Sequence, residues 1–132
     1  MKTILSIDDD AEILKCFKLA LESHGYRVFA TSSFDEFFTI LREQPIDLVL
    51  LDIRMPGKNG FDVFKEMREY KHLPVLFITA YAGSFALESD SVLEMWQNDF
   101  ADGETDILYK PFDLKTLYEK VAALIGSDEE SQ

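Results

Sequence analysis

The stretch Asp47-Leu48-Val49-Leu50-Leu51-Asp52-Ile53-Arg54-Met55-Pro56-Gly57-Lys58-Asn59-Gly60 decides the fold of this chain. Residues 48–51 are apolar on both faces of a strand, which is typical of a central parallel strand covered by helices on both sides. The run stops at Asp52, and because burying an unpaired charge is costly, we expect this carboxylate where the strand leaves the sheet. Met55-Pro56-Gly57 predicts a turn, and Asn59 can cap the helix that follows. The stretch therefore predicts one acid at the C-terminal mouth of a buried strand, where open α/β sheets bind their ligands.

Strand-like and helix-like segments alternate along the rest of the chain. Strands are expected over residues 3–7, 26–30, 48–51, 74–79 and 106–109, and helices over 12–23, from Ser33 to before Pro45, over 61–70, over 84–96 and from Asp113 onward. Five such alternations predict an α/β fold, a parallel sheet with helices on both faces. We expect one domain over residues 1–126 and a short, acidic, mobile tail over 127–132.

Composition narrows the classes of function. The chain has 132 residues, 47% of them apolar, which is enough for one domain with a core. Its net charge is −12, with 25 acidic residues against 13 lysines and arginines, and this disfavours direct binding to nucleic-acid phosphates. No apolar run is long enough to span a membrane, and Met1-Lys2-Thr3 leads into strand-like sequence rather than a signal peptide. We therefore expect a cytoplasmic protein without a membrane span.

The single cysteine and the two histidines are not expected to belong to a metal or catalytic site. Cys16 is the only cysteine, so no internal disulfide or cysteine-rich metal site can form. We expect it as a small core residue on the first helix. His24 and His72 lack the setting of a metal or catalytic site and are expected at the surface.

Polar residues follow four of the predicted strands. Asp8 and Asp9 follow the first strand, Asp52 ends the third, Thr79 ends the fourth, and Lys110 follows the fifth. Because the carboxyl ends of parallel strands share one edge of a sheet, we expect these residues to meet in space despite their separation in sequence.

This set of side chains is suited to phosphoryl chemistry. Three adjacent carboxylates repel and raise one another's pKa unless a cation joins them, and hard oxygen ligands of this kind suit Mg²⁺. Lys110 offers a charge and Thr79 a directed hydrogen bond to phosphoryl oxygens. The set therefore predicts a site that accepts a phosphoryl group, with Asp52 as the nucleophile.

Each of these residues also has an ordinary explanation when it is taken alone. The run Asp8-Asp9-Asp10 can cap a helix N-terminus, and Asp52 can be a turn residue. Thr79 can be an ordinary strand-end threonine, and Lys110 a solvated side chain. Their joint placement at strand ends favours a common site.

The chain resembles the receiver domain of two-component response regulators from about Lys2 to Ile125. The motifs that carry the resemblance, in the family's order, are Ile7-Asp8-Asp9-Asp10, Leu50-Leu51-Asp52-Ile53-Arg54-Met55-Pro56-Gly57, Asn59-Gly60, Thr79-Ala80 and Lys110-Pro111-Phe112. The resemblance implies a flavodoxin-like, three-layer (βα)5 sandwich whose parallel sheet has the strand order 2-1-3-4-5. It also implies a signalling switch rather than an enzyme with an external substrate.

The resemblance assigns roles to the acidic residues. Asp52 is similar to the phosphoacceptor, which takes its phosphoryl group from a phosphohistidine on a sensor histidine kinase or a phosphotransfer protein. Asp9 and Asp52 are similar to the side-chain ligands of Mg²⁺, with the backbone carbonyl of Arg54 as a third ligand. Asp8 is similar to an acid that acts near the metal through water.

The resemblance also assigns the residues around the phosphoryl group. Thr79 is similar to the switch hydroxyl and Lys110 to the lysine that contacts the phosphoryl group, and the bond to Pro111 is expected to be cis. Arg54 and Tyr81 stand two residues after Asp52 and Thr79, where family members tune the lifetime of the phosphoryl group. Bulky side chains at these positions hinder an attacking water molecule, so we expect slow loss of the phosphoryl group from Asp52.

The expected output is a changed protein-interaction surface made by the fourth helix, fifth strand and fifth helix. We expect a downstream protein or a fused output domain to bind this surface. The sequence does not decide whether the chain forms a homodimer.

Two features depart from the family pattern. Ile107 occupies a place where an aromatic residue is frequent, with Tyr109 directly before the lysine. The segment from Leu93 to Glu104 is long, and its Trp96 and Phe100 either pack inside or mark a docking surface.

Two other functions remain open from the sequence. A receiver-shaped module that binds partners without phosphorylation would keep the same fold. A small haloacid-dehalogenase-like phosphatase would use Asp8-Asp9-Asp10 as its Asp-x-Asp motif, but the chain is short for that fold and lacks a paired acid after the fourth strand.

Overall fold

Strands and helices alternate along the part of the chain that the structure describes. The structure is a computed structural model, and it describes residues 1–55, 58–69, 71–79 and 105–126. Its elements are β1 (Thr3–Ile7), α1 (Ala11–Glu22), β2 (Arg27–Thr31), α2 (Phe34–Glu43), β3 (Leu48–Asp52), β4 (Arg54–Met55), β5 (Lys58–Asn59), α3 (Gly60–Arg68), β6 (Val75–Thr79), β7 (Thr105–Tyr109) and α6 (Leu114–Ile125). The helix predicted over 84–96, the segment from Leu93 to Glu104 and the tail over 127–132 lie outside the described residues.

Five strands form one sheet in the order β2-β1-β3-β6-β7, and every neighbouring pair in it is parallel. Since β6 and β7 are its fourth and fifth strands, the predicted order 2-1-3-4-5 is confirmed. The observed strands differ from the predicted bounds by one residue in places; β2, for example, begins at Arg27 rather than Tyr26. After β3, the short strands β4 and β5 pair antiparallel, whereas residues 56 and 57 of the predicted turn lie outside the described residues.

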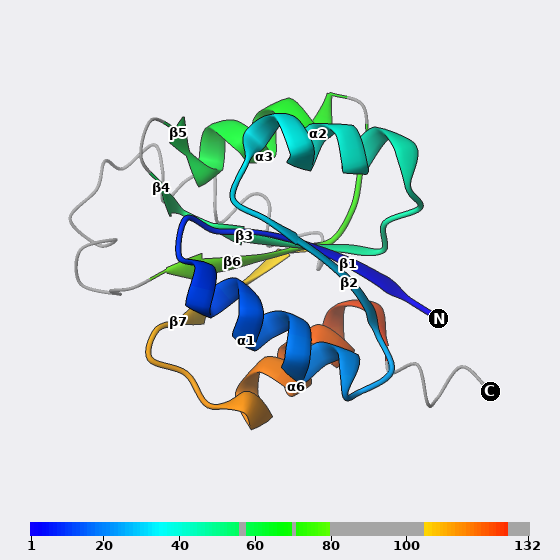
Figure 1. Cartoon of the computed structure of the whole chain (residues 1–132), viewed down its shortest axis with the longest axis vertical. Helices are drawn as coiled ribbons and strands as arrows, with labels where there is room; N and C mark the ends of the chain where they lie inside the picture. Colours follow the sequence, from blue (N-terminus) through cyan, green and yellow to red (C-terminus); the bar gives the residue numbers. More distant parts are fainter. Residues whose placement is uncertain (56–57, 70, 80–104, 127–132) are drawn as a thin grey trace.

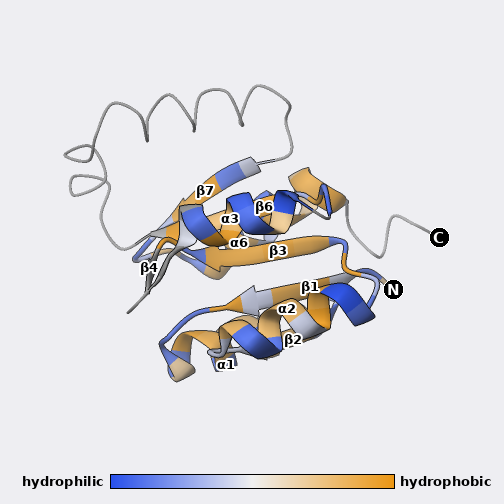
Figure 2. Ribbon diagram, turned by 90° about the horizontal axis from the view of Figure 1, so that it is seen from above, coloured by the Kyte–Doolittle hydropathy of each residue, from blue (hydrophilic) through white to orange (hydrophobic). Residues whose placement is uncertain are grey.

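Helices cover both faces of the sheet. Figure 1 shows α1 and α6 on one face and α2 and α3 on the other. Every residue of β1 and of β3 is buried, as expected for central strands with two covered faces. Alternate residues of β3 enter two separate hydrophobic clusters, Leu51 on the side of α2 and α3 and Leu50 on the side of α1 and α6. Figure 2 shows apolar residues along β3 in the middle of the sheet.

Side chains cap the N-termini of three helices. The Asp10 carboxylate accepts hydrogen bonds from the backbone N–H groups of Glu12 (2.9 Å) and Ile13 (3.3 Å) at the start of α1. Ser33 caps α2 and Asp113 caps α6, at the residues where the sequence places the starts of these two helices. The helix-cap explanation of the acidic run therefore belongs to Asp10, which leaves Asp8 and Asp9 for another role.

One prediction for α1 is wrong. Cys16 is exposed rather than buried. The inner face of α1 is formed by Leu14, Phe17, Ala20 and Leu21, whereas Ile13 is only partly buried. Leu14 lies three residues before Phe17 and seven before Leu21, so it completes an apolar stripe that leaves Cys16 on the outer side.

His24 and His72 are exposed, as predicted. No helix within the described ranges combines the length and the hydropathy that crossing a membrane requires.

Candidate functional site

Three carboxylates gather at the C-terminal edge of the sheet. In the parallel register of β1 and β3, Ile7 is paired with Leu51, so the next residues, Asp8 and Asp52, emerge at the same edge. One carboxylate oxygen from each of Asp8, Asp9 and Asp52 lies within 4.8 Å of the other two. Asp8 and Asp52 are 1% and 4% exposed, whereas Asp9 is exposed. We call this cluster of Asp8, Asp9 and Asp52 the cup: two of its carboxylates are buried and the third is exposed to solvent.

The Asp8 carboxylate is held in a position that is unfavourable for its charge. Burial raises the pKa of Asp8, although the Asp10 backbone N–H and the Lys110 ammonium oppose this rise. The Asp10 N–H donates a hydrogen bond of 2.9 Å to Oδ1 of Asp8. A bound cation would relieve the remaining cost, and three clustered carboxylate oxygens are ligands that fit Mg²⁺. The donor set of this cup therefore fits a hard divalent cation.

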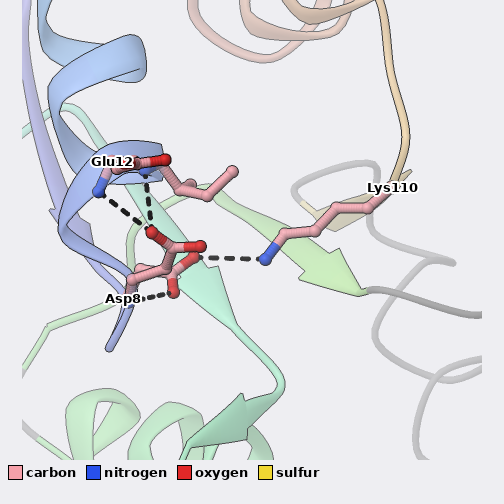
Figure 3. A network of polar contacts seen from close by, with 5 residues as sticks. Asp8, Glu12 and Lys110 are labelled. Carbon is pink, nitrogen blue, oxygen red and sulfur yellow. Dashed lines mark hydrogen bonds and ion pairs between the residues drawn. The ribbon is translucent and has the colours of Figure 1, made fainter.

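Lys110 reaches into the cup from the other side. It follows β7 directly, and its Nζ lies 3.4 Å from Oδ2 of Asp8. Figure 3 shows the Lys110 side chain extended toward the Asp8 carboxylate. The Lys110 side chain is 22% exposed against 2% for Asp8, so the ammonium stands at the rim. The peptide bond between Lys110 and Pro111 is cis, the conformation that the family resemblance implies.

Thr79 ends β6 at the same edge. Ile78 is paired with Asp52 across the ladder between β3 and β6, and Thr79 is paired with Tyr109 across the ladder between β6 and β7. The backbone of Thr79 therefore lies between the strand that carries Asp52 and the strand that leads to Lys110. Tyr81 lies outside the described residues, as do the side chains of Thr79 and Arg54.

Gly60 supports the site in a way that sequence reasoning missed. A Cβ atom at this position would lie 2.5 Å from the backbone oxygen of Asp52 and 2.8 Å from Cα of Ile53. The Gly60 N–H donates a hydrogen bond of 2.8 Å to the Ile53 carbonyl. The start of α3 thus presses against the end of β3, and only a glycine allows this approach. The available signal was the Asn59-Gly60 pair just before the predicted helix over 61–70, which also carries part of the family resemblance.

The two residues that depart from the family pattern lie in different environments. Ile107 is 8% exposed and belongs to the core cluster on the side of α2 and α3. Tyr109, directly before Lys110, is 44% exposed. An apolar core side chain thus occupies the place where an aromatic residue is frequent in the family, and the ring of Tyr109 is exposed.

Comparison with known proteins gives a consistent match. The model of a family described as "Response regulator receiver domain" matches residues 4–122. The transcriptional regulatory protein CpxR of Klebsiella pneumoniae is 35% identical over 125 residues, which are 95% of this chain and 50% of that protein. The nisin biosynthesis regulatory protein NisR of Lactococcus lactis is 36% identical over 129 residues, 98% of this chain and 52% of that protein. The chain thus spans about half the length of these relatives.

Solved structures with the same fold cover the chain almost completely. The chemotaxis protein CheY4 of Vibrio cholerae superposes with a TM-score of 0.76 at 28% identity, over 94% of this chain and 98% of that one. A response regulator receiver protein from Burkholderia phymatum gives a TM-score of 0.74 at 30% identity, over 96% of this chain and 97% of that one. The sheet order and the helical layers found here agree with these likenesses.

Proposed function

Since the chain belongs to the response regulator receiver domain family, we propose that it accepts a phosphoryl group on Asp52 and acts as a phosphorylation-dependent switch. The observation that carries this proposal is the cup itself. Its three carboxylates lie within 4.8 Å of one another, and a lysine ammonium lies 3.4 Å from one of them. A receiver unit over residues 1–126, with 127–132 as its tail, is part of the same proposal.

Asp9 and Asp52 would hold Mg²⁺ through their side chains, with the Arg54 backbone carbonyl as a third ligand and Asp8 acting through water. Such an ion, when bound, would offset the negative charge of the three carboxylates and would stabilise negative charge on the phosphoryl oxygens. The burial of Asp8 supports this assignment, because a buried carboxylate beside two others is stabilised when a cation binds.

An oxygen of the Asp52 carboxylate attacks the phosphorus atom of a phosphohistidine in line with the bond that breaks. The new P–O bond forms as the P–N bond of the donor breaks, and the leaving imidazole nitrogen takes up a proton from solvent. Lys110 places a positive charge next to the phosphoryl oxygens. The Thr79 hydroxyl moves toward the phosphoryl group and donates a hydrogen bond to one of its oxygens. The chain therefore promotes its own phosphorylation and its own dephosphorylation, and it turns over no external substrate.

Upstream, the partner is a sensor histidine kinase or a phosphotransfer protein. Downstream, phosphorylation changes a surface that includes β7 and α6, and a separate protein or a fused output domain reads it. Relatives named as transcriptional regulatory proteins are about twice as long as this chain, which supports an output outside the described domain. We propose a cytoplasmic location and no direct contact of this domain with nucleic acid, given a net charge of −12.

Incubation with a small acyl-phosphate donor and Mg²⁺ tests this function. Intact-mass measurement should show the addition of one phosphoryl group, and Asp52→Asn should abolish it. If no donor labels the chain although Mg²⁺ binds normally, the chain is a partner-binding module that works without phosphorylation. Turnover of a phosphate ester that survives Asp52→Asn but not Asp8→Asn would instead identify a phosphatase.

A further inference from the structure

The turn that carries Lys110 is anchored by one aromatic ring. Tyr109, Pro111 and Asp113 are exposed, so none of these side chains packs into the core, although that of Asp113 caps α6. Phe112 is partly buried and packs against the core cluster on the side of α1 and α6. Its ring stacks on that of Phe17 with a centroid distance of 5.5 Å and an angle of 12° between the ring planes.

Phe17 connects this turn to the acidic side of the cup. It is 1% exposed and lies on the inner face of α1. The same helix is capped by Asp10, whose backbone N–H also holds Oδ1 of Asp8. The stacked pair therefore joins the helix that follows the metal-binding carboxylates to the loop that presents the ammonium.

This connection has a direct consequence for Lys110. A lysine ammonium sits on a flexible stem, so the position of its charge depends on how firmly the backbone beneath it is held. On one side that backbone is held by β7, where Leu108 is 1% exposed. On the other side, Phe112 is the first aromatic residue after Lys110, and its ring packs against the core.

We propose that Phe112 is a positioning residue for Lys110: by stacking on Phe17 it holds the ammonium at the cup, where it meets the transferred phosphoryl group. The inference rests on the proposed phosphoryl acceptance by Asp52. Phe112 contributes no group to the chemistry, and its effect on the reaction passes through Lys110.

Two variants remove the stacked ring and keep apolar volume: Phe112→Leu and Phe112→Met. Loss of a stacked aromatic pair should slow labelling by an acyl-phosphate donor about threefold to tenfold. Mg²⁺ affinity, measured by calorimetry, should not fall, because Phe112 acts on Lys110 and not on the carboxylates that would bind the ion. In a Lys110→Ala background, either change should slow labelling no further, since the residue that it positions is gone.

Tyr118→Leu is the matched control. Tyr118, in α6, is like Phe112 a partly buried aromatic residue packed against the same cluster, and its ring stacks on that of His24, just after the C-terminal end of α1, with a centroid distance of 3.5 Å. This variant should label at the unmodified rate.

Several outcomes would overturn the inference. Unchanged labelling in both Phe112 variants, an equal slowing in the Lys110→Ala background, a parallel loss of Mg²⁺ affinity, or the same slowing in Tyr118→Leu would each do so. These results differ from a failure of the unmodified chain to become labelled, which would overturn the proposed function and this inference together.

Discussion

The Nζ atom of Lys110 lies 3.4 Å from Oδ2 of Asp8, although 102 positions separate the two residues in sequence. The parallel sheet makes this contact possible, because β1 and β7 both end at the edge where Asp52 also emerges. In the absence of a cation, the lysine ammonium balances part of the charge of the cup. The site is thus a place where charges are held close together at some cost, and several consequences can be measured.

The first prediction concerns Asp8→Asn. Burial raises the pKa of Asp8, so the folded chain disfavours its charged form. Folding stability is therefore lost as the pH rises from the unfolded-state pKa to the folded-state pKa, and the loss remains at neutral pH. Asp8→Asn should raise the free energy of unfolding in metal-free solution near pH 7, while weakening Mg²⁺ binding about tenfold to a hundredfold.

Urea denaturation at two pH values checks the sign of this effect. The advantage of Asp8→Asn should vanish at about pH 3, where the carboxyl is protonated in both folded and unfolded chains. A variant that is less stable than the unmodified chain at neutral pH would show that the Asp8 charge is a net stabilising one.

The second prediction concerns the response to metal. Mg²⁺ at a hundred times its dissociation constant should raise the free energy of unfolding by about 2.7 kcal/mol. Asp9→Asn and Asp52→Asn should remove most of this gain. Asp10→Asn should keep it, because Asp10 caps α1 and asparagine caps a helix equally well. A metal response that is lost equally in all three variants would exclude a specific site.

The third prediction concerns Gly60→Ala. The new Cβ would lie 2.5 Å from the Asp52 backbone oxygen, so the end of β3 or the start of α3 must shift. We expect a loss of about 1–3 kcal/mol in the free energy of unfolding and slower labelling of Asp52. Lys65→Ala, an exposed change on the same helix, is the control and should have little effect on either. A Gly60→Ala chain with unchanged stability and labelling would mean that the approach of α3 to β3 has no role at the site.

The fourth prediction concerns the lifetime of the phosphoryl group. Arg54 and Tyr81 are bulky residues two positions after Asp52 and Thr79, and they should slow the attack of water on the phosphorylated chain. Tyr81→Ala should therefore shorten the half-life, as followed by intact-mass measurement after the donor is removed. Loss within seconds from the unmodified purified chain, with no phosphatase present, would contradict this explanation.

The features that sequence predicts well are those that depend on local pattern and general topology. The apolar run 48–51 predicted a buried central strand, and β3 is buried at every residue. Asp52 was placed at the strand end because a charge is costly to bury, and it is buried at the mouth among partners rather than within the apolar core. Once the sheet was predicted to be parallel, the gathering of Asp8, Asp9 and Lys110 followed from the shared edge.

The features that sequence could not predict depend on three-dimensional contacts. Cys16 was expected in the core, but the face of α1 that packs on the sheet carries Leu14, Phe17, Ala20 and Leu21 and leaves Cys16 exposed. The closeness of Gly60 to Asp52 depends on the angle at which α3 leaves the loop. The stacking of Phe112 on Phe17 joins residues from opposite ends of the chain, and no local pattern marks it.

Direct mapping of the phosphorylated residue tests the central claim most closely. The chain is incubated with Mg²⁺ and an acyl-phosphate donor, and borohydride then reduces any acyl phosphate on an aspartate to the homoserine side chain. Peptide mass spectrometry should find this conversion at position 52, and it should disappear when Mg²⁺ is chelated. Conversion at another aspartate with position 52 unchanged, or no conversion while Mg²⁺ is bound, would contradict the account.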